Sequence, residues 1–112
     1  METLDSKMGM KNADWLQEQL DSGVKLILLD LRGVEAVKRG HIAGSKQVNF
    51  VDLPSRFEEL IPSKESTVIV ICNGSIQSAM AMMFLRLEGY EKSYNLSGGF
   101  SGWERNERPI VS

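Results

Sequence analysis

Apolar residues gather along this 112-residue chain in short unbroken runs and in helically spaced sets, and the two kinds alternate. Residues 26–31 (LILLDL) form a nearly continuous apolar run, which is typical of a strand covered on both faces. Residues 67–71 (TVIVI) are β-branched throughout and give the strongest strand signal of the chain. Weaker patterns predict short strands at residues 47–50 and 93–96.

Helices are predicted between these strands from their boundary residues. Asn12 is a good N-cap and Gly23 is placed to stop a helix, so the first helix is predicted between them. Residues 33–39 are charged and weakly helical. Pro54 suits a first helical position, which predicts a short helix over residues 55–61.

The longest predicted helix follows the β-branched run and ends near Gly89. Its apolar residues recur at helical spacing, namely Ile76, Ala79, Met80, Met83 and Leu87. We interpret Met80, Met82 and Met83 as adaptable packing rather than as a ligand site. Gly98 and Gly99 predict a turn into a short segment that carries Trp103.

Alternating strands and helices predict an α/β fold with an open, mainly parallel sheet, right-handed crossovers and helices on both faces. Residues 1–11 are expected to form a loose N-terminal segment, and residues 12–112 a single domain. A chain of this length leaves no room for a second domain.

Charge and composition narrow the possible functions. The net charge of −2 gives no basic field, so we expect no nucleic-acid partner. No apolar run approaches the roughly 20 residues of a bilayer-spanning helix, and we expect a cytoplasmic monomer without a membrane partner. One cysteine and one histidine allow neither an internal disulfide nor a metal site of four Cys/His ligands, and we expect no cofactor.

That single cysteine, Cys72, stands where the β-branched strand is predicted to end. Ligands of open α/β sheets bind beside the carboxyl ends of the strands. A loop of small residues before a helix can present backbone N–H groups to an anion, and the same field favours a thiolate, the nucleophilic form of cysteine. Free cysteine is equally a common buried apolar residue. The residues alone leave these two interpretations open.

Several motifs occur together in one order along the chain. They are Asp30-Leu31-Arg32, Gly40-His41-Ile42-Ala43-Gly44, Cys72, and Leu96-Ser97-Gly98-Gly99-Phe100 with Trp103 and Pro109. In order and spacing they resemble the D-x-R, G-H-I-x-G, catalytic cysteine and L-x-G-G-F-x-x-W motifs of the rhodanese-like family.

This resemblance implies a rhodanese-like fold and sulfur transfer. The Cys72 thiolate would take a sulfane sulfur from a donor such as thiosulfate, hold it as a persulfide, and pass it to a thiophilic acceptor. The persulfide and the donor would be held by backbone N–H groups of the loop, in Asn73, Gly74, Ser75, Ile76, Gln77 and Ser78. Asp30, Arg32 and His41 are expected to have structural roles near the site.

The loop also departs from the family pattern C-x-x-G-x-R, because Gln77 stands where active members carry arginine. Without that cation, slow turnover with thiosulfate is expected. The alternative function is a non-enzymatic binding or sulfur-relay module that uses a partner protein. A cysteine phosphatase is disfavoured, because its C-x-x-x-x-x-R loop would require arginine at Ser78.

Overall fold

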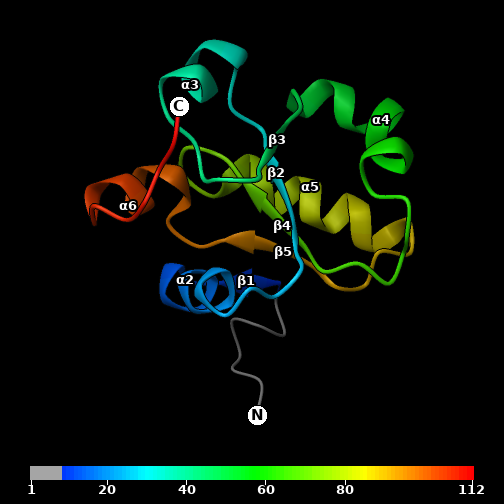
Figure 1. Ribbon diagram of the computed structural model, residues 1–112. Coiled ribbons are helices and arrows are strands. Elements are labelled where there is room, and N and C mark those ends of the chain that lie inside the picture. Colours follow the sequence, from blue (N-terminus) through cyan, green and yellow to red (C-terminus); the bar gives the residue numbers. More distant parts are fainter. Residues whose placement is uncertain (1–8) are drawn as a thin grey trace.

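The computed structural model describes residues 9–112, and these residues form a five-stranded sheet covered by helices (Figure 1). All strand pairs are parallel, and the spatial order is β1-β5-β4-β2-β3. The strands are β1 (Met10–Lys11), β2 (Ile27–Asp30), β3 (Lys46–Gln47), β4 (Val68–Ile71) and β5 (Ser93–Leu96). The predicted open α/β sheet is therefore confirmed.

Helices cover both faces of this sheet, as predicted. They are α2 (Ala13–Asp21), α3 (Val34–Arg39), the 3-10 helix η1 (Phe50–Asp52), α4 (Leu53–Leu60), α5 (Ile76–Leu87) and α6 (Gly99–Arg105). Figure 1 shows α4 and α5 on one side of the strands and α2 and α6 on the other. The Asn12 side chain caps α2 as predicted, because its Oδ1 accepts a hydrogen bond from the Trp15 N–H at 2.8 Å.

The two faces of the sheet have separate apolar cores, and alternate residues of the central strands β2 and β4 supply both of them. In β4, Val68 and Val70 pack toward α4 and α5, whereas Ile69 and Ile71 pack toward α2 and α6. Every residue of β4 is therefore buried, which explains the unbroken apolar run in the sequence. Packing on both faces thus fixes the position of β4 between two helical layers, and Cys72 directly follows its last residue.

Three boundaries differ from the sequence expectations, and one of them is the start of α4, which lies at Leu53 rather than at residue 55. The strand expected at residues 47–50 covers only Lys46–Gln47, and the chain then enters η1. Of the expected loose segment 1–11, residues 1–8 lie outside the described part, and Met10–Lys11 form β1 beside β5. A strand of two residues is too short to leave a readable pattern of apolar positions.

The helically spaced residues of α5 lie on the opposite face from the one that contacts the core. The buried side chains of α5 are Ser78, Ala81, Met82 and Leu85. Met82 packs as interpreted, whereas Met80 and Met83 are exposed, so their interpretation as packing residues is wrong. Apolar residues occur on both faces of α5, and spacing alone therefore cannot identify the buried face.

Among the described residues, no helix is both long enough and apolar enough to cross a membrane.

Tyr90 anchors the start of the segment between α5 and β5 and gives a test of this packing. Its buried hydroxyl donates a hydrogen bond of 2.9 Å to the Ile61 carbonyl oxygen. Burial raises the pKa of Tyr90 above its ordinary value of 10.0, and the nearby Glu58 and Glu88 raise it further.

Tyr90→Phe is expected to lower the free energy of unfolding by about 1 kcal/mol near neutral pH, because the Ile61 carbonyl loses its donor. Above about pH 10 the unfolded wild type releases a phenol proton that the folded state retains, so wild-type stability falls as pH rises. The variant should lack this part of the alkaline fall. Urea unfolding near neutral pH and above about pH 10 measures the free energy of unfolding of both proteins. An identical alkaline loss of stability in the two proteins would show that the Tyr90 hydroxyl is not its source.

Candidate active site

Cys72 begins the loop between β4 and α5, at the carboxyl edge of the sheet. A pocket of about 210 Å³ opens here, and it is lined by Leu31, Arg32, Cys72, Asn73, Gly74, Ser75, Ile76 and Gln77. Parallel pairing brings the ends of β2 and β4 together, since Asp30 is in register with Ile71. The pocket thus gathers every loop residue expected from the sequence except Ser78, which is fully buried beneath it.

Two carbonyl groups of the loop point to the start of α6. The Cys72 carbonyl accepts a hydrogen bond from the Phe100 N–H at 2.8 Å, and the Asn73 carbonyl accepts one from the Ser101 N–H at 3.0 Å. In a trans peptide the N–H points opposite to the C=O, and this chain has no cis peptide among its described residues. The N–H groups of Asn73 and Gly74 therefore point away from α6.

The N–H groups of the loop have no protein acceptor. Within residues 9–112, none of the six backbone N–H groups from Asn73 to Ser78 donates a hydrogen bond to another protein atom. The last three belong to the first turn of α5, where helical N–H groups have no partner within the helix. Five of the six residues line the pocket, so the pocket offers a row of unpaired donors to an anion.

Cys72 lines this pocket and also contacts the core. The residue is only 6% exposed and packs with the apolar cluster between the sheet and α4 and α5. Its Sγ–H donates a hydrogen bond of 3.3 Å to the Ser78 hydroxyl oxygen. A hydroxyl can rotate and donate in turn, so Ser78 can also stabilise a Cys72 thiolate. The residue is therefore largely shielded from bulk water, although it lines the pocket.

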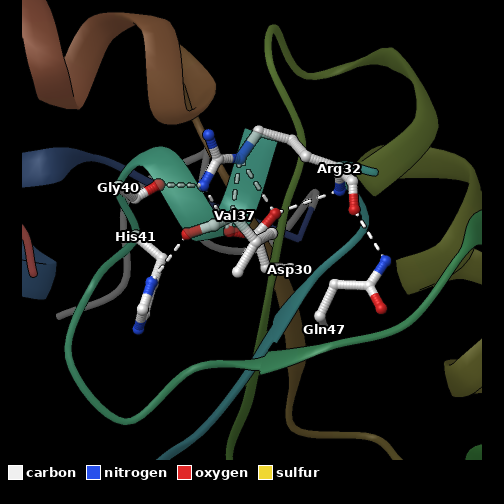
Figure 2. Close-up of polar contacts among 6 residues, drawn as sticks. All are labelled: Asp30, Arg32, Val37, Gly40, His41 and Gln47. Atoms are coloured by element: carbon white, nitrogen blue, oxygen red, sulfur yellow. Dashed lines mark hydrogen bonds and ion pairs between the residues drawn. The ribbon is translucent and has the colours of Figure 1, made fainter. Parts of the chain in front are cut away.

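Asp30 and Arg32 form a buried ion pair beside the loop (Figure 2). Arg32 Nη2 lies 2.8 Å from the Asp30 carboxylate and 2.7 Å from the Gly40 carbonyl oxygen. Its guanidinium carbon lies 3.6 Å from the centre of the Phe100 ring. Asp30 already compensates the charge of Arg32, so the arginine offers the pocket no free charge. It instead packs against Phe100, the residue whose N–H donates to the Cys72 carbonyl.

His41 lies in the turn after α3 and outside the pocket lining. Its Nδ1 is 2.9 Å from the Val37 carbonyl oxygen, and a carbonyl can only accept, so Nδ1 carries the hydrogen (Figure 2). The backbone of His41 also exchanges two hydrogen bonds with Val111. Through these contacts His41 joins the end of α3 to the C-terminal segment, which is a structural role.

Gln77 is exposed on the pocket wall and supplies no charge. Arg32 is the one cation in that lining, and Asp30 neutralises it. Within the described residues, no group of three or more His, Cys, Asp or Glu side chains is placed to hold a metal ion. The pocket can therefore hold an anion only through hydrogen bonds and helix polarity.

The sequence indicated neither the role of Ser78 nor that of the start of α6. The predicted turn at Gly98 and Gly99 is present, but it was not predicted that the N–H groups of the next two residues, Phe100 and Ser101, hold the carbonyls of Cys72 and Asn73. The consecutive glycines were the available signal, because such a pair often marks a close approach of two backbones.

Comparison with known proteins places these features in context. The family described as "Rhodanese-like domain" matches residues 12–106. A sulfurtransferase of Allochromatium vinosum is 28% identical over 101 residues, which cover 90% of this chain and 92% of that protein. The thiosulfate sulfurtransferase GlpE of Tolumonas auensis is 32% identical over 76 residues, covering 68% of this chain and 70% of that protein.

The fold has the same relatives. The solution structure of the rhodanese-like domain of an Anabaena protein, Alr3790, superposes with a TM-score of 0.82 at 27% identity. The match covers 93% of this chain and 79% of the Anabaena chain. Family, sequence relatives and solved structure thus agree on one type of domain.

Gly99→Ala tests whether the contact with α6 positions the loop. Gly99 has a φ of +60°, and an added Cβ would lie 1.8 Å from the Gly74 carbonyl oxygen. The loop must then move, and we expect Cys72 alkylation by iodoacetamide to change at least about tenfold, which corresponds to about 1.4 kcal/mol.

Gly98→Ala is the matched control for this prediction. Gly98 has a φ of +81°, but no atom lies within 4 Å of an added Cβ. This variant should lose only the roughly 1–2 kcal/mol of stability expected from left-handed backbone strain, with little change in alkylation. Equal effects of the two substitutions on alkylation would show that the close approach at Gly99 does not position the loop.

Proposed function

Because the chain belongs to the family of rhodanese-like domains, we propose that it is a sulfurtransferase whose Cys72 carries the transferred sulfur as a persulfide. The family match and the sulfurtransferases among its relatives support a sulfurtransferase or sulfur-relay role. We further propose that Cys72 is the sulfur carrier and that thiosulfate is one type of donor.

The single observation that carries this proposal is the thiol of Cys72 in a pocket lined by unpaired backbone N–H groups. A persulfide places a second, anionic sulfur one bond beyond Sγ. Backbone donors that are already fixed in position stabilise such a charge without reorganising. The hydrogen bonds from α6 turn the Cys72 and Asn73 carbonyls toward α6. The negative persulfide would therefore face N–H groups rather than these carbonyl oxygens.

The proposed reaction has two displacement steps. In the first, the Cys72 thiolate attacks the outer sulfur of a donor such as thiosulfate, a new S–S bond forms, and the S–S bond of thiosulfate breaks. Sulfite leaves with the bonding electron pair. In the second, a thiophilic acceptor such as cyanide attacks the terminal sulfur, forms thiocyanate, and regenerates the Cys72 thiolate. Division into two steps replaces one difficult transfer by two easier ones.

A specific observation also favours a sulfur relay that uses a protein donor. The pocket contains no uncompensated cation, so a small dianion such as thiosulfate gains no ion pair when it binds. Turnover with thiosulfate is therefore proposed to be slow. A donor that binds through a larger surface would not need such a charge.

Cys72→Ser is expected to abolish thiocyanate formation from thiosulfate and cyanide while leaving the fold intact, because serine replaces the thiol with little change in volume. Intact-mass spectrometry after incubation with donor should show one added sulfur atom on the wild type and none on the variant. A thermal unfolding curve controls for folding. Wild-type turnover in a folded Cys72→Ser protein would remove Cys72 from the mechanism.

Gln77→Arg should supply the missing cation at the pocket wall. One partly exposed charge interaction of about 1 kcal/mol predicts a roughly fivefold lower KM for thiosulfate. The same cation favours the thiolate, so alkylation of Cys72 near neutral pH should become faster. Gln77→Met has a similar length without a charge and is the matched control. If both variants behave alike, the missing charge does not limit activity.

A further inference from the structure

One side of α5 is covered by large apolar side chains that face solvent. Ile76 is 78% exposed, Met80 53%, Met83 61% and Leu87 87%. Their spacing of four, three and four residues aligns them on one face of the helix, over a length of about 16 Å. We call these four residues the apolar stripe.

The other residues of α5 add little charge to this face. Arg86 is the one charged residue within α5, and its Nε donates a hydrogen bond of 2.8 Å to the Ser93 carbonyl oxygen of β5. Its guanidinium carbon also lies 5.1 Å from the Tyr94 ring centre. Surface helices normally present polar residues opposite their buried face, and a continuous exposed apolar patch typically marks an interaction site.

The apolar stripe is continuous with the Cys72 pocket. Ile76 is both the first residue of the stripe and part of the pocket lining. Met80, Met83 and Leu87 follow about one, two and three helical turns away from it. A molecule that covers the stripe therefore also reaches the mouth of the pocket.

The size of the stripe favours a transient partner. A stable interface buries about 800 Å² on each partner, which is more than four side chains on one helix supply. Short-lived redox encounters bury less, typically under about 1,200 Å² in total. Methionine side chains adapt to different surfaces, which suits contacts with more than one partner. A permanent pair of identical chains is thus the less suitable occupant.

We propose that the apolar stripe docks a protein that carries a cysteine persulfide, and that such a protein is the preferred sulfur donor to Cys72. This docking role rests on the proposed function. The stripe would supply binding free energy that small anions do not gain in the pocket, because its one cation, Arg32, is already paired with Asp30. In the transfer, the Cys72 thiolate attacks the terminal sulfur of the donor persulfide. An S–S bond forms on Cys72, the donor S–S bond breaks, and the donor cysteine leaves as a thiolate.

The experiment compares a large and a small persulfide donor on the same variants. The protein probe is a cysteine desulfurase charged with L-cysteine, and the small probe is glutathione persulfide. The variant combines Met80→Gln, Met83→Gln and Leu87→Gln, because glutamine is a good helix former and none of the three residues lines the pocket. Val51→Gln is the matched control, since Val51 is 80% exposed but lies outside α5.

For the wild type we expect faster transfer from the desulfurase than from glutathione persulfide, measured as kcat/KM by trapping the Cys72 persulfide. The triple variant should lose about tenfold or more with the desulfurase and less than about twofold with glutathione persulfide. Val51→Gln should match the wild type with both donors. These three results together support the docking role.

Other results overturn it. Equal losses with both donors, or no advantage of the desulfurase over glutathione persulfide in the wild type, would remove the docking role alone. A wild-type dimer in sedimentation velocity that the triple variant abolishes would assign the stripe to a second copy. Stripe-dependent binding to phosphatidylglycerol vesicles would assign it to a membrane surface. If Cys72 gains no sulfur from any donor, the proposed function fails, and the docking role fails with it.

Discussion

The close approach of α6 to the Cys72 loop is the contact on which the site depends. Two N–H groups at the start of α6 hold the carbonyls of Cys72 and Asn73, and this turns the N–H groups of the following residues away from α6. Gly99 permits the approach, since a side chain there would overlap the loop carbonyls. Backbone hydrogen bonding alone thus produces a row of donors, without any charged side chain.

The buried pair Asp30 and Arg32 supports this contact from the neighbouring strand. Removing either partner would leave an uncompensated buried charge, which is far more costly than the pair itself is stabilising. Arg32 donates hydrogen bonds to the Asp30 carboxylate and the Gly40 carbonyl, and its guanidinium plane packs against the Phe100 ring. It therefore joins the end of β2, the end of α3 and the start of α6 into one support beneath the loop.

The sequence predicted those elements whose signals are local. The apolar runs identified β2 and β4, and the cap at Asn12 identified the start of α2, because burial on both faces and capping depend on neighbouring residues. The orientation of the loop carbonyls depends on residues almost thirty positions later, so no local pattern could indicate it. The buried face of α5 was misassigned because both of its faces carry apolar residues.

The shortness of the two outer strands affects how this molecule behaves at high concentration. Sheet edges are templates on which identical chains can stack into fibrils, and β1 and β3 offer only two residues each. Such short edges give a neighbouring chain little backbone to pair with. Molecules that associate through the exposed apolar side chains of α5 therefore find little edge backbone with which to extend into an ordered fibril.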